Sequence, residues 1–341
     1  MDKIRLGKTE LMVTSSSFGV LPLQRLPMDE AVRILQKAYD EGINYYDTAN
    51  AYTDSEEKIG RALSHVRQNI VISTKSGGKD KKTVISHIEN SLRTLRTDYI
   101  DLFQFHNPAE MPNPDDPDGS YAAAALMKEK GYVRHIGITN HRLPLAMEAV
   151  KTGWFETMQF PFSYLAADDE IALVNACKEA DMGFIAMKGL AGGLLTDARA
   201  CKAYMAQFDN VVPIWGIQSM EQLEQWIELE KNPPEMTDDV KAVIEKDRKE
   251  LIGNFCRGCG YCLPCPVEID IPTAARISML LRRSPYKRFM KESFYEEIHR
   301  IDDCLECYSC ASKCPYSLDT PKLLKSMLAD YEEFYAVHKN D

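Results

Sequence analysis

Short apolar runs alternate with segments of helical periodicity along the first 245 residues. The apolar runs hold five to eight residues each and lie at 16–20, 43–48, 70–75, 99–106, 133–139, 157–162, 183–188 and 211–216. Between them, apolar residues recur with helical spacing at 29–41, 56–63, 82–95, 121–131, 143–151, 169–180 and 220–229. A strand that is apolar throughout is typical of a parallel sheet buried on both faces. The pattern therefore predicts eight β–α units.

Eight such units in about 245 residues favour a TIM (β/α)8 barrel, which usually takes about 250 residues. A doubly wound open sheet is the alternative α/β fold, and it more often carries a Gly-rich dinucleotide loop after its first strand. Here the first strand is followed by Gly-Val-Leu-Pro-Leu at residues 19–23, without a G-x-G-x-x-G spacing. The barrel is therefore the expected fold of this region.

The composition changes near residue 245. Residues 1–245 carry 26 basic and 36 acidic side chains and hence the whole net charge of −10, whereas residues 246–341 carry 15 of each. Eight of the ten cysteines also fall in the second part. The change coincides with the charged run 238–250, which follows Pro233 and Pro234. We therefore predict two domains, 1–245 and 246–341.

The overall composition excludes several classes of protein. With 45% apolar and 27% charged residues, the chain is typical of a globular protein and not of a disordered one. The acidic balance argues against a nucleic-acid binder. The sequence has no run of 18 apolar residues that would predict a membrane span. Its first residues lack the apolar core of a signal peptide, so we expect a cytoplasmic protein.

Four polar residues follow consecutive predicted strands. Asp47, Lys75 and His106 end the second, third and fourth strands, and Tyr52 lies in the loop after the second. A barrel gathers such positions at its C-terminal face. A lysine ammonium lowers the pKa of a nearby tyrosine from its usual value of about 10, a carboxylate holds the lysine in place, and an imidazole donates to a carbonyl oxygen. Together these groups can protonate a developing alkoxide while hydride reaches the carbon.

The motifs around these residues resemble those of the aldo-keto reductase family. They are Gly-Ile-Asn-Tyr-Tyr-Asp-Thr-Ala at 42–49 with Tyr52, Ile-Ser-Thr-Lys at 72–75, and the run 91–102 that leads to His106. The resemblance covers most of residues 3–230. It implies that Asp47, Tyr52, Lys75 and His106 are a catalytic tetrad with the tyrosine as general acid. It also implies a nicotinamide cofactor across the barrel mouth, with its carboxamide near Thr139, Asn140 and Gln159.

The sequence departs from the family pattern around the expected cofactor. The run after the seventh strand is Ala-Met-Lys-Gly-Leu at 186–190, so Met187 replaces the usual stacking ring, next to Lys188 and Leu190. The family's basic residue after the eighth strand is absent, since Gly-Ile-Gln-Ser follows at 216–219, and its later asparagine falls on Trp226. Lys188 is either a compensating pyrophosphate ligand or a solvated lysine. These changes weaken the adenosine end of an NAD(P)H site.

The C-terminal cysteines form two groups. The second group has the C-x2-C-x2-C-x3-C-P spacing of bacterial ferredoxins, and the first is one residue shorter before its last cysteine. The distant fourth cysteine of each run completes the other cluster, which predicts two [4Fe–4S] clusters. The first would be held by Cys256, Cys259, Cys262 and Cys314, and the second by Cys304, Cys307, Cys310 and Cys265. Zinc and a single cluster are the alternatives.

The 38 residues between the cysteine groups have helical periodicity at 271–283 and 286–300, and a last amphipathic helix is predicted at 320–338. This arrangement resembles the α-helical ferredoxin modules of anaerobic redox enzymes. Residues 276–291 hold six basic and no acidic side chains. They form either a docking patch for an acidic ferredoxin or flavodoxin, a face against the acidic barrel, or a solvated helix.

Three functions fit these features. The first is an oxidoreductase that interconverts a small-molecule carbonyl and an alcohol, with electron transfer through the clusters. One-electron clusters and two-electron hydride chemistry usually need a nicotinamide or a flavin between them; no flavin motif is evident, although a barrel mouth could hold one. The second is an ordinary NAD(P)H carbonyl reductase with structural or sensing clusters. The third is an electron-transfer partner with a non-catalytic barrel.

Overall fold

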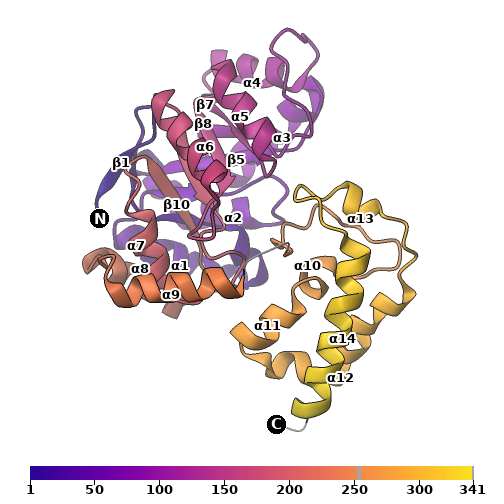
Figure 1. Ribbon diagram of the computed structural model, residues 1–341. Helices are drawn as coiled ribbons and strands as arrows, with labels where there is room; N and C mark the ends of the chain where they lie inside the picture. The colour runs from indigo at the N-terminus through magenta and orange to yellow at the C-terminus, as the bar shows by residue number, and fades with distance from the viewer. Residues whose placement is uncertain (252–254, 340–341) are drawn as a thin grey trace. The chain divides into compact units, whose positions relative to one another are not determined.

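The computed structural model describes residues 1–251 and 255–339 and divides into two compact units (Figure 1). The first unit comprises Met1–Gly189 and Ala198–Ala242, and the second comprises Leu190–Asp197 and Val243–Asp341. The chain therefore enters the second unit once between β9 and α7 and again within α9. The division into domains 1–245 and 246–341 stays a prediction.

The first unit is built on a closed parallel barrel with the strand order β10-β3-β4-β5-β6-β7-β8-β9. Each predicted apolar run coincides with one of these strands to within a few residues, so the prediction of a barrel and not of an open sheet is confirmed. The strands are β3 (Ser17–Gly19), β4 (Tyr45–Asp47), β5 (Val71–Ser76), β6 (Ile100–His106), β7 (Val133–Thr139), β8 (Thr157–Pro161), β9 (Gly183–Met187) and β10 (Val211–Gly216).

Helices α1 to α8 follow these strands in the chain. Seven of them were predicted from periodicity, and α7 was not, because nearly every residue of α7 is buried and no polar face marks it. The helices are α1 (Met28–Asp40), α2 (Ser55–Leu63), α3 (Lys81–Leu95), α4 (Ser120–Glu129), α5 (Leu143–Thr152), α6 (Asp168–Glu179), α7 (Ala198–Met205) and α8 (Met220–Lys231).

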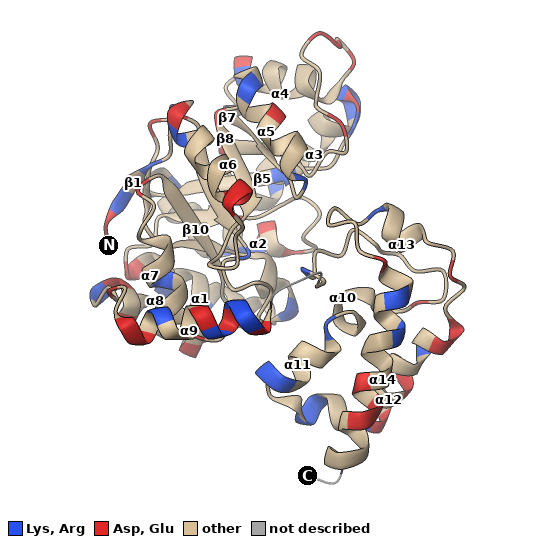
Figure 2. Ribbon diagram, in the orientation of Figure 1, with Lys and Arg blue, Asp and Glu red and all other residues tan. Residues whose placement is uncertain are grey.

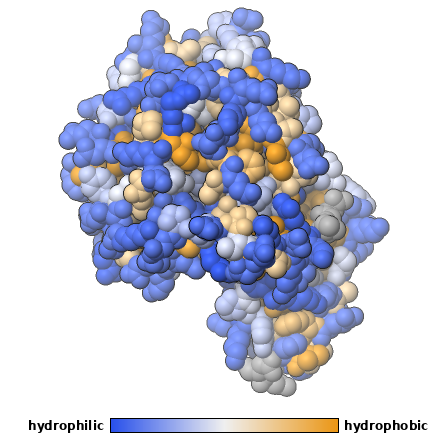
Figure 3. Space-filling view, turned by 60° about the vertical axis from the view of Figure 1, so that its left-hand side comes forward, coloured by the Kyte–Doolittle hydropathy of each residue, from blue (hydrophilic) through white to orange (hydrophobic). Residues whose placement is uncertain are grey.

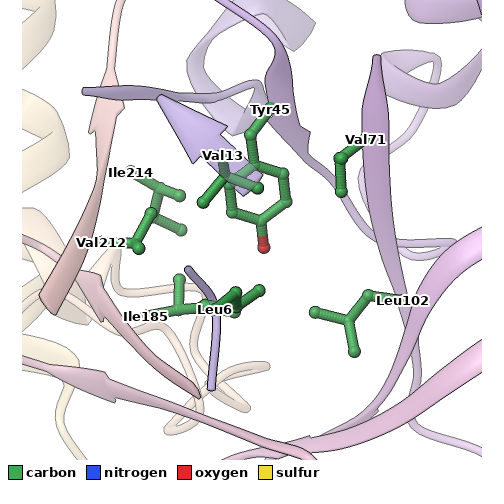
Figure 4. Close-up of a cluster of buried hydrophobic side chains, with 8 residues drawn as sticks. All are labelled: Leu6, Val13, Tyr45, Val71, Leu102, Ile185, Val212 and Ile214. Atoms are coloured by element: carbon green, nitrogen blue, oxygen red, sulfur yellow. The ribbon is translucent and has the colours of Figure 1, made fainter. Parts of the chain in front are cut away.

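A short hairpin precedes the barrel strands and contributes to the barrel core. It pairs β1 (Lys3–Arg5) with β2 (Met12–Thr14) in antiparallel fashion. Leu6 and Val13 from this segment lie among apolar side chains from the barrel strands (Figure 4). Gly7 is required there, since its φ is +54° and an added Cβ would lie 2.2 Å from the backbone nitrogen of Gly183. The sequence pattern did not predict this hairpin.

The second unit is helical in the described residues. Apart from α9 (Asp238–Glu250), whose N-terminal part belongs to the first unit, its helices are α10 (Ile271–Ala274), α11 (Ile277–Arg283), η3 (Tyr286–Met290), α12 (Glu292–Ile298), η4 (His299–Asp303), α13 (Ser309–Ser312) and α14 (Thr320–His338). The helix predicted at 320–338 has these same bounds. The segment predicted at 271–283 is instead two helices, because the backbone leaves the helical region at Arg276 (φ −127°).

The core of this unit forms where α14 meets the preceding helices. Tyr331 is fully buried, contacts the ring of Phe294 and donates a 2.8 Å hydrogen bond to the carbonyl oxygen of Phe289. The face in Figure 3 is largely hydrophilic, with apolar side chains showing in places between charged ones. Over the described ranges, every helix falls short of the length and apolar character that crossing a bilayer requires.

Candidate functional site

The barrel brings the four predicted catalytic residues to one end. Asp47 and His106 are the last residues of β4 and β6, and Lys75 is the penultimate residue of β5. In the ladder, Asp47 pairs with Ser73 and Lys75 pairs with Gln104, so the carboxyl ends of the three strands are adjacent. Parallel pairing alone therefore fixes the order of these side chains along the barrel rim.

Asp47 and Lys75 form a buried ion pair. The Nζ atom of Lys75 lies 2.6 Å from Oδ1 of Asp47 and donates a second hydrogen bond of 2.5 Å to the carbonyl oxygen of Thr48. The hydroxyl of Ser73 donates to Oδ2 of Asp47 at 2.6 Å. Burial lowers the pKa of Lys75, and the charge of Asp47 opposes that shift. The ammonium group is therefore held in one position by hydrogen bonds on two sides.

Tyr52 and His106 lie beside this pair. The Nζ atom of Lys75 is 5.4 Å from the centroid of the Tyr52 ring. The Tyr52 and His106 rings meet edge to face, with centroids 5.7 Å apart and an interplanar angle of 82°. Burial, with a smaller contribution from the charge of Lys75, lowers the pKa of His106 to about 3. The imidazole is therefore neutral near pH 7 and has one N–H to donate.

A second histidine belongs to this end of the barrel and was missed in the sequence. His141 follows β7, is buried, and has a pKa well below its usual value because of burial and the nearby Lys188, His106 and Arg142. The backbone N–H groups of His141 and Arg142 donate to Oδ1 of Asn140 at 2.9 and 2.7 Å. The sequence offered one indication that His141 belongs to the site, because this residue directly follows the Ile-Thr-Asn motif at 138–140.

The predicted nicotinamide contacts divide into two sets. Gln159 and Met187 lie close to the ion pair: Nε2 of Gln159 is 3.4 Å from Oδ1 of Asp47 and 3.8 Å from Sδ of Met187. Thr139 and Asn140 connect the loops after β6 and β7, since Oγ1 of Thr139 accepts from the backbone N–H of Asn107 at 3.0 Å.

The other two predicted contacts follow β9. Lys188 has a left-handed backbone (φ 57°) and acts electrostatically on His141. Leu190 begins the segment Leu190–Asp197, which belongs to the second unit. The structure therefore does not place Leu190 in the barrel unit with the remaining predicted contacts.

The departures at Trp226 and Ser219 have structural roles in the barrel unit. The rings of Trp226 and Trp215 stack with centroids 3.9 Å apart and an interplanar angle of 13°, and both side chains are buried. The indole N–H of Trp215 donates to Oγ of Ser16 at 3.0 Å. Ser219 caps α8 by accepting from the backbone N–H of Gln222. In this barrel unit, Trp226 thus contributes to the core and Ser219 to a helix cap.

One cavity of the second unit gathers the predicted ligands of the second cluster. Its lining includes all four of them, together with Cys262 and apolar residues. The four ligands are Cys265, Cys304, Cys307 and Cys310. The sequence separates Cys265 from Cys304 by 38 residues, so the fold brings the crossed fourth ligand to its predicted partners. A set of four thiols around one cavity fits an iron–sulfur cluster.

The predicted ligands of the first cluster also lie near one another. Burial raises the pKa of Cys256, and the neighbouring Cys259 and Cys314 add smaller shifts in the same direction. Burial likewise raises the pKa of Cys262 to about 12, with smaller shifts from Cys256 and Cys259. Metal binding favours the thiolate, which burial disfavours. Across the described residues, no three His, Cys, Asp or Glu side chains are arranged to hold a single metal ion.

The basic residues at 276–291 are partly paired within their own unit. Arg282 forms a two-point ion pair with Asp330, at 2.6 and 2.7 Å. Arg283 lies 2.8 Å from Asp247 and 2.5 Å from Glu250 of α9. In Figure 2, α9 and α14 carry both blue (Lys, Arg) and red (Asp, Glu) segments, whereas α11 carries blue ones alone. Because some of the basic residues at 276–291 are already paired with carboxylates, this segment offers fewer free positive charges for docking than its sequence indicates.

Comparison with known proteins defines the class. Residues 14–211 match the Aldo/keto reductase family, and residues 255–319 match the 4Fe-4S dicluster domain. Since the first match covers more than half of the chain, the protein belongs to the aldo/keto reductase family and is an oxidoreductase of that type. The C-terminal domain is an iron–sulfur domain. The resemblance stated from the sequence is confirmed in both parts.

Curated relatives match the barrel region. The Uncharacterized oxidoreductase YqkF of Bacillus subtilis (strain 168) is 30% identical over 211 residues, which cover 58% of this chain and 67% of that protein. L-galactose dehydrogenase of Arabidopsis thaliana is 31% identical over 212 residues, which cover 56% of this chain and 66% of that protein. The chain thus spans about two thirds of the length of these relatives.

Solved structures share the barrel. The holo form of aldo-keto reductase AKR11C1 from Bacillus halodurans has a TM-score of 0.64 and 25% identity, over 72% of this chain and 96% of that chain. An aldo-keto reductase from Klebsiella pneumoniae, solved in complex with NADPH, has a TM-score of 0.63 and 21% identity, over 72% of this chain and 94% of that chain. The second likeness supports the fold alone.

Proposed function

We propose that this protein interconverts a carbonyl and an alcohol at Asp47, Tyr52, Lys75 and His106, with electrons passing through two [4Fe–4S] clusters. The observation that carries the proposal is the convergence of these four side chains at one end of the barrel. In particular, the buried Lys75 ammonium lies both 2.6 Å from Asp47 and beside the Tyr52 ring. A buried charge pair that lies beside a tyrosine and a histidine at a barrel mouth is typical of a functional site.

The chemistry assigns one role to each side chain. Tyr52 gives its phenolic proton to the alkoxide that forms as the carbonyl is reduced, and the ammonium of Lys75 stabilises the phenolate left behind. His106, neutral at physiological pH, donates an N–H to the substrate oxygen. Asp47 keeps the ammonium in place. A nicotinamide, when bound, supplies the hydride; Gln159, Thr139 and Asn140 are its proposed carboxamide contacts, and a flavin is the alternative two-electron carrier.

The iron–sulfur domain supplies single electrons. Cys256, Cys259, Cys262 and Cys314 would hold one cluster, and Cys265, Cys304, Cys307 and Cys310 the other. The eight cysteines are free thiols in the structure. Because thiolate ligation requires reduced cysteines, we propose that the protein works in the cytoplasm, where thiols stay reduced.

We propose that a small one-electron carrier, such as a ferredoxin or flavodoxin, delivers electrons at the second cluster. Cys307 is exposed, unlike the other seven proposed ligands. The neighbouring Leu305 and Tyr308 are 65% and 51% exposed and line the same cavity. Apolar side chains around an accessible redox centre suit a small, transient interface. Leu305→Glu should slow cluster reduction by the carrier, whereas Val337→Glu, at an equally exposed apolar residue of α14, should not.

An anaerobic titration tests the proposal as a whole. The reconstituted protein should hold about eight irons per chain, as two cubanes require. NADPH and NADH are then added separately while the cluster absorbance is followed. Bleaching of the clusters would support one electron path from barrel to clusters. Binding without bleaching would favour an ordinary NAD(P)H carbonyl reductase with structural clusters.

A further inference from the structure

Arg276 lies at the break between α10 and α11, and its side chain reaches two separate loops of the second unit. Its Nε atom donates to the carbonyl oxygen of Pro272 at 2.8 Å, which fixes the start of the side chain. Its Nη1 atom donates to the carbonyl oxygen of Gly192 at 2.9 Å. Gly192 belongs to Leu190–Asp197, the segment that follows β9 in the chain. These two hydrogen bonds hold the guanidinium in one orientation.

The guanidinium packs against the backbone of the first cysteine loop. A Cβ atom added to Gly258 would lie 2.7 Å from Cζ of Arg276 and 2.8 and 2.9 Å from its two terminal nitrogens. Gly258 also has a left-handed φ of +61°, and its backbone N–H donates to Sγ of Cys256 at 3.3 Å. The cation therefore lies directly beside a residue that binds the sulfur of a proposed cluster ligand.

The second contact also lies at a glycine with a left-handed backbone. Gly192 has a φ of +69°, and an added Cβ would lie 2.7 Å from Nη1 of Arg276. The loops at Gly192 and Gly258 thus both have a glycine, which has no side chain, where the guanidinium packs. An arginine stays protonated at any physiological pH, so its positive charge is a permanent feature of this loop.

We propose that Arg276 sets the reduction potential of the cluster held by Cys256, Cys259, Cys262 and Cys314, and anchors Leu190–Asp197 beside it. Reduction adds one negative charge to a cluster, and a cation nearby stabilises the reduced form. The charge of Arg276 raises the reduction potential of this cluster. The N–H groups of its guanidinium hold the segment Leu190–Asp197 by hydrogen bonding. This inference rests on the proposed clusters but not on the proposed carbonyl chemistry. Arg276 acts as a positioning and tuning residue.

Two variants of the full chain separate charge from hydrogen bonding. Arg276→Gln removes the charge, and Arg276→Lys keeps it but loses the planar fork. Arg282→Gln is the matched control, because Arg282 is a basic residue of α11, the helix that Arg276 precedes, and pairs with Asp330. Each protein is reconstituted anaerobically, its iron content is measured, and the two cluster potentials are determined by potentiometric titration followed by electron paramagnetic resonance.

In Arg276→Gln we expect the reduction potential of one cluster to fall. At the midpoint potential of that cluster in the wild-type protein, the ratio of reduced to oxidised cluster should drop at least about threefold. This drop is equivalent to about 30 mV for a one-electron couple. Arg276→Lys and Arg282→Gln should keep both potentials. Hydrogen exchange at residues 190–197 should rise in both Arg276 variants and not in the control.

Unchanged potentials in an Arg276→Gln protein with full iron content would overturn the proposal. Loss of iron from both Arg276 variants would also overturn it, since the residue would then be needed for cluster assembly and not for tuning. A wild-type protein that fails to bind eight irons contradicts the proposed clusters instead, so the two failures are distinguishable.

Discussion

The two units hold their functional groups by different physical means. In the barrel, Asp47, Lys75 and His106 are part of β4, β5 and β6, and the continuous parallel ladder sets their spacing. In the second unit, the described residues contain helices but no strand, and most of the eight proposed ligands lie in irregular loops. Backbone hydrogen bonds thus organise the first site without a ligand. We expect the second site to depend on its ligand for order, as is usual where metal binding is coupled to folding.

The charged residues show the same contrast. The barrel buries complete ion pairs, such as Lys75 with Asp47 and Arg67 with Asp101, the latter at 2.6 Å. In the second unit, Arg283 and Asp247 form one largely buried pair, whereas pairs such as Arg300 with Glu268 are largely exposed. Exposed pairs contribute about 0–1 kcal/mol each, whereas removing one partner of a buried pair costs about 3–5 kcal/mol. Among the described residues, the barrel unit therefore has more buried ion pairs than the second unit, where Arg283 and Asp247 form one.

The largest expected effect separates catalysis from cluster binding. Tyr52→Phe should lower carbonyl turnover by about 10²–10⁴-fold, because the proton donor is lost, and should leave the iron content unchanged. Steady-state kinetics and iron analysis measure both quantities on one preparation. The exposed Tyr132→Phe serves as the control. Full turnover in a properly folded Tyr52→Phe protein would rule out the tetrad chemistry.

Removal of iron tests the contrast in stability directly. Anaerobic chelation should abolish hydrogen-exchange protection across 255–338 while β5 and β6 keep theirs, since only the second unit is organised by metal ligands. The three tryptophans, Trp154, Trp215 and Trp226, all lie in the barrel unit, so the wavelength of their emission maximum should stay unchanged. Unaltered protection in the second unit would show that its apolar core around α14 suffices without metal.

A core substitution should affect only the barrel. Trp226→Ala removes the stack on Trp215 and should lower the free energy of unfolding by about 3–5 kcal/mol. Urea unfolding followed by fluorescence of the remaining tryptophans measures the change, and Trp154→Ala, at a 38% exposed residue, should cost less. A cluster spectrum unaffected by Trp226→Ala is also expected. A cost below that of Trp154→Ala would contradict a structural role for Trp226.

The smallest expected effect concerns acid stability. With a native pKa of about 3 and an unfolded value near 6.5, His106 is neutral in the folded barrel while the unfolded chain binds a proton. Stability is therefore lost as the pH falls below about 6.5, by up to about 1.4 kcal/mol per pH unit. His106→Gln should flatten this dependence between pH 7.5 and 5 in urea titrations followed by tryptophan fluorescence. Substituting the exposed His65 by Gln should leave the pH dependence of stability unchanged. If the stability of His106→Gln depended on pH as steeply as that of the wild-type protein, the buried neutral imidazole would be contradicted.

The sequence by itself determined the repeating barrel, the rim positions of Asp47, Lys75 and His106, the two cysteine groups and the final helix. Each of these depends on local periodicity or on fixed spacing, which a single chain displays directly. The crossed placement of Cys265 with Cys304 was also predicted, because the ferredoxin spacing contains it.

Only the tertiary structure decided the remaining features. The hairpin that fills the barrel with Leu6 and Val13, the fully buried α7, the Trp215–Trp226 stack and the position of His141 beside His106 all depend on contacts between distant residues. The same holds for Arg276, whose partners lie at Gly192 and Gly258. Local patterns show which face of an element is apolar but not which distant group packs against it. For this reason the pairing of far-apart residues became visible only in the folded chain.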